Sequence, residues 1–124
     1  MVDFRMVNPE RLTPPLRLKR RAEFLEVAGK GRKAPMPGLV LQALTRAEPA
    51  PLRLGFTVTK KVGNAVVRNR TRRRLQEAAR VLLTRMPVHG VDLVLIGRAG
   101  TNKRTFIELQ SDIRRAMKKL GVIS

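Results

Sequence analysis

Basic side chains crowd one segment of the chain, the run from Lys60 to Arg74. The run begins with two lysines and continues with five arginines, and it contains no carboxylate. A guanidinium group presents paired N–H donors that match the oxygens of a phosphate, and an ammonium group attracts the same anion. The chemistry that this segment offers is therefore the binding of phosphates. Its basic residues are Lys60, Lys61, Arg68, Arg70, Arg72, Arg73 and Arg74.

Side chains that could cleave a phosphodiester are scattered along the chain. A protein nuclease needs paired carboxylates that hold metal ions, or a histidine that works as acid and base. The one histidine, His89, lies in a predicted turn between Pro87 and Gly90, and the 9 Asp and Glu residues form no recognisable metal motif. No cysteine is present to act as a nucleophile or a zinc ligand. We therefore predict no catalytic residue and no metal site in this chain.

The net charge predicts a polyanion as partner. The 124 residues include 27 Lys and Arg against 9 Asp and Glu, which gives a formal net charge of +18, well beyond what solubility requires. Nucleic acid is favoured over two alternatives, an anionic membrane surface and a merely solvated basic surface. With 4 Phe and no Trp or Tyr, a sheet that stacks bases is hard to build. Recognition should therefore rest on the phosphates and shape of a structured RNA.

Two patterns are absent from the sequence. It has no uninterrupted apolar run of about 18 residues, which a membrane-spanning helix would need. The first ten residues lack the apolar core of a signal peptide. We predict a cytoplasmic protein.

Hydrophobic periodicity predicts one α+β domain behind the basic segment. Residues 1–18 contain three prolines and should form an irregular arm, and residues 19–124 should form the domain. The element order is αββαβα, and the second strand should run antiparallel to the first. The expected helices are 19–28, 64–85 and 105–120, and the expected strands are 39–44, 52–60 and 91–96.

Local signals set the ends of these elements. Gly29 and Gly31 should stop the first helix, and two prolines at 35 and 37 should delay the first strand. Thr105 and Glu108 form a capping box for the last helix. Phe106 should begin the apolar stripe of that helix and face the core.

The helix predicted at 64–85 has an unusual start. Its apolar stripe begins at Leu75, and helical spacing continues it backwards only with the polar Thr71, Arg68 and Asn64. We therefore expect its first two turns to extend past the core, with their arginines directed away from the protein. The helix dipole opposes cations at this end, so helix stability does not explain them. Free N–H groups at the helix start, opened by Gly63 or Asn64, would contribute to a phosphate site.

The segment around the Arg68-Asn69-Arg70 triplet closely resembles the signature of the bacterial ribonuclease P protein component. In this chain the signature is KKVGNAVVRNRTRR, from Lys60 to Arg73, and it follows a strand that contains LGFTV. The resemblance extends over nearly the whole chain. It implies a ribosomal-protein-like fold, a two-layer αβ sandwich whose mixed sheet includes a left-handed β-α-β crossover.

The resemblance also implies a function. In that family an RNA subunit is the catalyst, and it removes the 5′ leader of precursor tRNA with magnesium that is bound mainly by the RNA. This chain would be the non-catalytic protein subunit of that endonuclease, a hydrolase, with one protein per RNA. Its partners would be the catalytic RNA and precursor tRNA. A structural ribosomal protein is the alternative, because it would share the charge, the arm and the αβ core.

Two sets of residues are assigned by the resemblance. Contacts with the catalytic RNA would come from Lys61, Asn64, Arg68, Asn69, Arg70, Arg72, Arg73 and Arg74. Contacts with the leader would come from Phe24, Thr57 and Lys60, in a cleft between the first helix and the sheet. From the residues alone, Phe24 suits the core equally well. Ala28 and Gln42 stand where many relatives carry aromatic side chains, so two rings that could stack on the leader are missing here.

Overall fold

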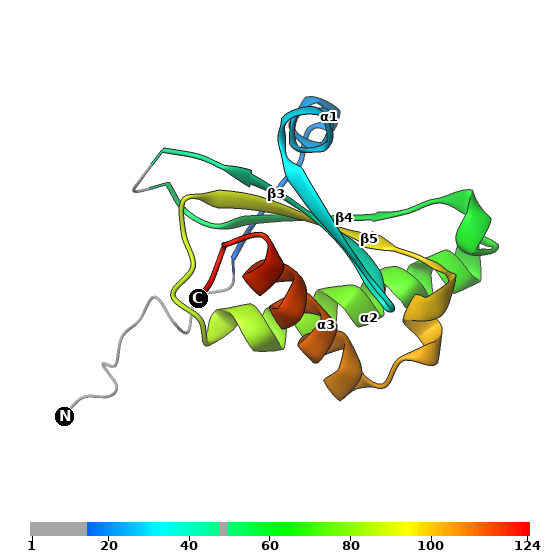
Figure 1. Ribbon diagram of the computed structural model, residues 1–124. Coiled ribbons are helices and arrows are strands. Elements are labelled where there is room, and N and C mark those ends of the chain that lie inside the picture. Colours follow the sequence, from blue (N-terminus) through cyan, green and yellow to red (C-terminus); the bar gives the residue numbers. More distant parts are fainter. Residues whose placement is uncertain (1–14, 48–49) are drawn as a thin grey trace.

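The computed structural model describes residues 15–47 and 50–124, which form a five-stranded mixed sheet and three α-helices (Figure 1). Most of the arm predicted at 1–18 lies outside the described residues. The strands are β1 (Leu16–Arg17), β2 (Arg32–Met36), β3 (Leu39–Thr45), β4 (Arg53–Val58) and β5 (Val91–Gly97). The helices are α1 (Arg21–Lys30), α2 (Ala65–Thr84) and α3 (Phe106–Lys119), with two short 3-10 turns, η2 (Lys60–Val62) and η3 (Ala99–Lys103). The predicted α+β class is confirmed.

The strand order across the sheet is β1-β4-β5-β3-β2. β4 and β5 are parallel neighbours connected through α2, and β3 pairs antiparallel with the other side of β5. β4 therefore runs antiparallel to β3, as predicted, but the two strands do not pair because β5 lies between them. The central place of β5 explains why it is apolar on both faces.

Helices lie on both faces of the sheet. α2 and α3 cover one face and form the predicted two-layer sandwich with it, while α1 lies on the opposite face (Figure 1). A smaller apolar cluster, formed by Leu18, Val27 and Val94, packs between α1 and the sheet. The main core between the sheet and the α2–α3 pair includes the whole stripe predicted in α2, which is Leu75, Ala78, Ala79, Leu82 and Leu83. Of the helices in the described ranges, α2 and α3 thus cover one face of the sheet and the short α1 covers part of the other.

The start of α3 confirms one prediction and corrects another. Thr105 Oγ1 accepts a hydrogen bond from the Glu108 N–H at 3.1 Å, and Glu108 Oε1 accepts one from the Thr105 N–H at 2.8 Å, so the capping box is present. The prediction that Phe106 faces the core was wrong, because its side chain is 38% exposed. Phe106 occupies the first position of α3 and lies beside arginines of α2. The buried stripe begins one turn later, at Leu109.

Two edge strands were not predicted. β2 contains Pro35, which was expected to delay a strand. The sheet tolerates this proline because β2 is an edge strand, where one side of the backbone needs no partner. β1 lies in the segment predicted as arm, and its two residues pair with Arg53 and Leu54 of β4. Leu18 directly after it is buried, so the packed domain begins before the predicted boundary at Lys19.

The first helix is longer at its C-terminal end than predicted. Gly29 lies inside α1 rather than ending it, and its surroundings are open. Gly31 does end the helix, because it is the C-cap residue and its backbone is extended. A Cβ at this residue would lie 2.5 Å from the carbonyl oxygen of Ala43, so glycine allows the end of α1 to pack closely against β3. None of the helices in the described ranges has the length and apolar character that a membrane span requires.

Candidate nucleic-acid interface

The turn between β4 and α2 presents Lys60 and Lys61 to solvent, since both lie in η2 and both are exposed. Gly63 follows them, at a position where a Cβ would lie 2.9 Å from the Cβ of Val67. Asn64 then caps α2, because its Oδ1 accepts a hydrogen bond from the Val67 N–H at 3.0 Å. The predicted turn and helix start are confirmed. The compact turn holds both ammonium groups at the end of the sheet.

Three arginines of α2 form an unneutralised cationic surface. Arg70 and Arg73 are exposed, and neither makes a hydrogen bond or ion pair within residues 15–47 and 50–124. Arg72 Nη1 donates a hydrogen bond to Asn69 Oδ1 at 2.9 Å, between exposed side chains. The nearest acid along the helix is Glu77, and its carboxylate pairs with Arg80. These three guanidinium groups are therefore available to phosphates.

Arg74 points into the protein, contrary to the prediction that it faces away. Its Nη1 donates to the carbonyl oxygen of Thr101 at 2.7 Å, and its Nη2 donates to the carbonyl oxygen of Arg104. Both carbonyls belong to the segment between β5 and α3. Arg74 thus ties this segment to α2, and its sequence position within the basic run gave no sign of that role.

The prediction that two full turns of α2 extend past the core was also wrong. Thr71 is fully buried, and its hydroxyl donates to the carbonyl oxygen of Val67 at 2.8 Å. The same hydroxyl accepts a hydrogen bond from Asn102 Nδ2 at 2.8 Å. The 3-10 turn η3 therefore packs over Thr71, the first polar residue that continues the apolar stripe of α2 towards the helix start. Arg68 is half-buried and donates to the carbonyl oxygen of Gly63 at 3.1 Å, so it braces the turn before α2.

The predicted leader residues lie along one line on the α1 face of the sheet. The ring of Phe24 packs directly over Gly55 of β4, where any Cβ would overlap it. Thr57 follows two residues later on the same face, and Lys60 lies just beyond the end of β4. Phe24 is half-buried against the small apolar cluster. The ring of Phe24 therefore packs against the protein with one part and is accessible to solvent with another.

The strand register extends this line into a strip of accessible sheet. Thr57 of β4 is paired with Ile96 of β5, which is paired with Val40 of β3. All three are half-buried. Gln42 lies on the same face and is half-buried too. Sequence analysis missed Ile96 and Val40, because side-by-side placement of three strands depends on a strand order that the sequence does not reveal.

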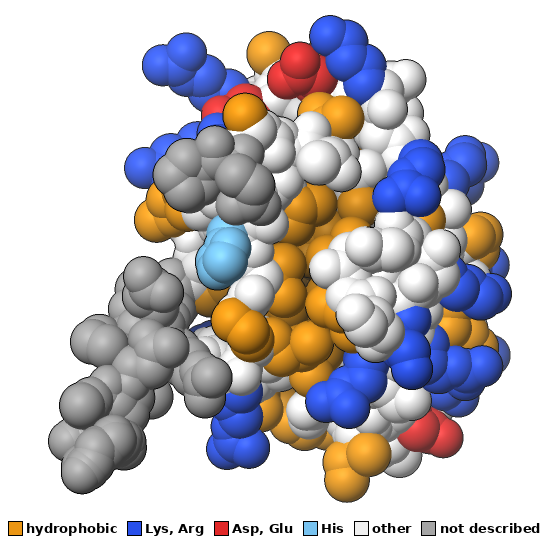
Figure 2. Space-filling view, turned by 60° about the vertical axis from the view of Figure 1, so that its left-hand side comes forward, with side chains coloured by type: hydrophobic (Ala, Val, Ile, Leu, Met, Phe, Trp, Pro, Cys, Tyr) orange, Lys and Arg blue, Asp and Glu red, His pale blue; other side chains and the backbone are white. Residues whose placement is uncertain are grey.

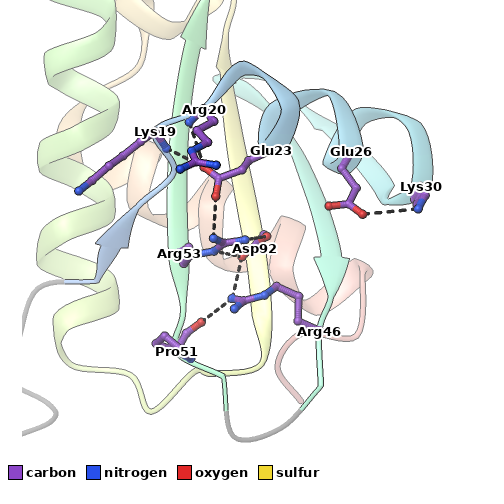
Figure 3. A network of polar contacts seen from close by, with 9 residues as sticks. All are labelled: Lys19, Arg20, Glu23, Glu26, Lys30, Arg46, Pro51, Arg53 and Asp92. Carbon is purple, nitrogen blue, oxygen red and sulfur yellow. Dashed lines mark hydrogen bonds and ion pairs between the residues drawn. The ribbon is translucent and has the colours of Figure 1, made fainter.

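A network of ionic contacts holds α1 against the sheet (Figure 3). Arg53 of β4 contacts both oxygens of the buried Asp92, from Nε to Oδ1 at 2.9 Å and from Nη2 to Oδ2 at 2.7 Å. Its Nη1 donates to Glu23 Oε2 of α1 at 2.8 Å. Arg46 Nη1 also donates to Asp92 Oδ1 at 2.9 Å. Arg53 is therefore neutralised by two acids that are distant from it in sequence.

These contacts perturb two of the groups. The hydrogen bonds and charge of Asp92 raise the pKa of the Arg53 guanidinium. Hydrogen bonds from the backbone N–H groups of Arg20 and Lys19, aided by Arg53, lower the pKa of the Glu23 carboxyl. Both pKa shifts favour the charged forms of Arg53 and Glu23.

The surface drawn in Figure 2 is mainly apolar and basic, and the described acidic side chains do not cluster. The face in Figure 2 has hydrophobic side chains in its middle, Lys and Arg side chains around its margin, and few acidic ones. Within the described ranges no three His, Cys, Asp or Glu side chains lie close enough to hold a metal ion. The buried Asp112 is held by Arg104 and by the backbone N–H of Gly38. The described acids therefore do not fit a resident metal site.

Comparison with known proteins decides the family. The sequence pattern of the family described as Ribonuclease P matches residues 12–121. The chain belongs to the ribonuclease P protein family. It is 68% identical over 106 residues to the ribonuclease P protein component of Gluconacetobacter diazotrophicus, covering 86% of this chain and 91% of that protein. It is 47% identical over 111 residues to that of Paramagnetospirillum magneticum, covering 86% and 84%.

Solved structures of ribonuclease P proteins have the same fold. The Staphylococcus aureus protein superposes with a TM-score of 0.72 at 28% identity, covering 87% of this chain and 97% of that one. The Thermotoga maritima protein superposes with a TM-score of 0.68 at 26% identity, with the same coverage. As a ribonuclease P protein component, this chain is a subunit of a ribonuclease complex that processes the 5′ ends of tRNAs, and it associates with the RNase P RNA.

Proposed function

We propose that this chain binds the RNase P RNA through the turn before α2 and the outward side of that helix. The observation that carries the proposal is a cluster of exposed or half-exposed cations within a few turns, with no neutralising carboxylate among the described residues. The cluster consists of Lys60, Lys61, Arg70, Arg72 and Arg73. Arginine forks on a rigid helix match the phosphates of a folded RNA. Asn64, Arg68 and Arg74 support this surface from behind, since their side chains form hydrogen bonds with the backbone of the protein.

The chemistry of cleavage is assigned to the RNA subunit, with magnesium bound mainly by that RNA. Two features of the described residues support this assignment. The buried carboxylates of Asp92 and Asp112 are held by arginines, and the described ranges contain no cluster of acids for metal-assisted hydrolysis. Magnesium would supply the nucleophile and charge stabilisation at the RNA. The protein would add positive charge, which reduces the magnesium needed to fold and bind two polyanions.

The 5′ leader of precursor tRNA is assigned to the α1 face of the sheet. The accessible strip formed by Thr57, Ile96 and Val40 runs across three strands, beside Phe24 and below Lys60. The three side chains that form the strip are uncharged and half-buried. A single-stranded leader could lie across it with its phosphates near Lys60, while Phe24 offers a ring edge to one base.

The test is cleavage of precursor tRNA by the cognate RNase P RNA, with and without the purified chain, at low magnesium. We expect the chain to stimulate cleavage strongly at low magnesium and weakly at high magnesium, because added divalent ions replace the protein charge. Absence of stimulation would reject the proposal. Cleavage by the protein without RNA would instead reject the assignment of catalysis to the RNA.

Leader contact is tested with the same reagents. Phe24→Ala should weaken binding of substrate that has a leader more than binding of mature tRNA. Equal weakening of binding to both ligands would mean that Phe24 is a packing residue only.

We further propose one protein per RNA and a location in the cytoplasm. Sedimentation of the complex would check the stoichiometry, and cell fractionation would check the location.

A further inference from the structure

Phe106, at the start of α3, is an aromatic residue whose ring is partly exposed to solvent. Its side chain is 38% exposed, although periodicity placed it in the apolar stripe of α3. A phenylalanine left partly in water forgoes stabilisation that full burial would provide. Ile107 beside it is 76% exposed. Two adjacent apolar side chains are thus exposed at the start of α3.

The ring of Phe106 forms part of a shallow niche between α2 and α3. The niche has a volume of about 360 Å³ and is lined by Arg70, Arg73, Arg74, Glu77 and Phe106. Two of the arginines, Arg70 and Arg73, have no hydrogen bond or ion pair within the described part of the chain. An exposed ring thus lies beside two available guanidinium groups.

The walls of this niche are fixed by contacts of their own. Arg74 binds the carbonyl oxygens of Thr101 and Arg104, and Arg104 immediately precedes the cap of α3. The position of Phe106 relative to α2 is therefore set by Arg74. Glu77 is the one acid in the niche, and Arg80 neutralises it. An anion would therefore meet little repulsion there.

We propose that this niche binds one unpaired nucleotide of the RNase P RNA. The base stacks on the ring of Phe106, and its flanking phosphates contact Arg70 and Arg73. Stacking requires a base that is free of a duplex, and every base offers a face for it. The inference rests on the proposed function and deepens it, because it adds an aromatic contact to a surface assigned so far to phosphates alone.

The position of the niche selects the RNase P RNA over the leader. Phe106 lies in the α2–α3 layer, whereas Phe24 and Thr57 lie on the α1 face of the sheet. The sheet separates the two surfaces. A leader that follows the α1 face does not reach Phe106, but an RNA that contacts Arg70 and Arg73 lies directly at the niche.

The experiment measures affinity for the cognate RNase P RNA with three substitutions of Phe106. Phe106→Ala should weaken binding about 5-fold to 150-fold, the range found when one stacked base loses its aromatic partner. Phe106→Tyr keeps the ring and should bind within about 3-fold of the wild type. Phe106→Leu keeps apolar bulk without a ring and should bind nearly as weakly as the alanine variant. Wild-type affinity for the leucine variant would overturn stacking.

Two further measurements locate the contact. Chemical probing of the RNA should find one unpaired nucleotide that wild-type protein protects and Phe106→Ala leaves reactive, and protection that does not depend on Phe106 would overturn the proposal. Loss of protection only on precursor tRNA would also overturn it. Ile107→Ala is the matched control, since this residue is exposed but does not line the niche, and it should leave affinity unchanged. If wild-type protein neither binds nor stimulates the RNA, the proposed function itself fails; if only the Phe106 series shows no effect, the niche alone fails.

Discussion

Four arginines of α2 fall into two groups by what their guanidinium groups touch. Arg70 and Arg73 face solvent, whereas Arg68 and Arg74 donate hydrogen bonds to backbone carbonyls. The arginine-rich half of α2 thus combines side chains that support the fold with side chains whose guanidinium groups face solvent. The difference arises because η3 and the turn before α2 contact only part of the helix circumference.

The first prediction separates these groups. Arg70→Ala should weaken binding of the RNase P RNA about 5-fold to 10-fold and reduce the salt slope of binding by about one, because one phosphate contact is lost. Its free energy of unfolding should not change. Filter binding at several salt concentrations and urea denaturation would check both parts. A large loss of stability would show that Arg70 has a structural partner.

Arg74→Ala should behave in the opposite way. It removes two charge-assisted hydrogen bonds to carbonyl oxygens, so we expect a loss of about 1.5–3 kcal/mol of stability. Urea denaturation would measure it, with Arg70→Ala as the matched control. If the free energy of unfolding is unchanged and RNA binding is weaker, Arg74 contacts the RNA and does not support the fold.

At the scale of elements, the position of α1 depends on Arg53. This side chain joins Glu23 of α1 to the buried Asp92 of β5 (Figure 3). The ring of Phe24 follows Glu23 in the helix and lies over Gly55. Ionic contacts at the base of α1 therefore set where the ring of Phe24 lies against the sheet.

Replacement of Arg53 tests this dependence. Arg53→Met should destabilise the fold by about 3 kcal/mol, because Asp92 would remain buried with Arg46 as its only described ionic partner. Lys30→Ala is the control, since its pair with Glu26 is exposed and should contribute less than about 1 kcal/mol. Thermal or urea denaturation would compare the two. Equal effects would mean that the network does not hold α1.

A fall in pH should weaken the attachment of α1 through Glu23. The pKa of Glu23 is lowered from its ordinary value of 4.5, first by the Arg20 and Lys19 backbone N–H groups and then by Arg53. A carboxyl with a lowered pKa in the folded state binds fewer protons than in the unfolded chain, so its contribution is present above its ordinary pKa and is lost as pH falls below it. Glu23→Gln keeps an acceptor for the N–H groups but has no charge. Its unfolding free energy should fall less than that of the wild type between about pH 6 and pH 3, and parallel curves would contradict this.

The elements that sequence could predict are those with a strong local signal. The stripe from Leu75 to Leu83 fixed α2, and the pairing of Thr105 with Glu108 fixed the start of α3. β2 was missed because Pro35 argues against a strand unless the strand is known to lie at an edge. Phe106 was misplaced because periodicity cannot tell whether the first turn of a helix has a core beneath it.

The candidate site was predictable in its chemistry and only partly in its geometry. The Lys60 to Arg73 signature identified the basic surface and the family. It could not show that Arg74 turns inward, or that Arg53 is neutralised by Asp92, because both contacts join segments about 30 or more residues apart in the chain. Such contacts depend on strand order and on η3, which leave no mark in local composition.

At the scale of the whole molecule, the net charge of +18 raises the question of whether RNA binding is a general effect of charge or the work of one surface. The proposed surface lies at the α2 start, where the turn after β4 brings Lys60 and Lys61 beside the arginines. Basic residues also lie elsewhere, including Arg114 and Arg115 on the exposed side of α3. Both explanations predict salt-dependent binding, but they differ in which cations set the slope.

Two double variants with the same loss of charge distinguish these explanations. About five phosphate contacts at the proposed surface correspond to a slope near −4 in a plot of log affinity against log salt. Replacing Arg70 and Arg73 with Gln should reduce the magnitude of this slope by about two, because both guanidinium groups would contact phosphates. Replacing Arg114 and Arg115 with Gln lowers the net charge equally and should leave the slope nearly unchanged. Equal reductions in both variants would mean that the RNA responds to the overall charge of the protein. The α2 surface would then not be the specific binding site for the RNA.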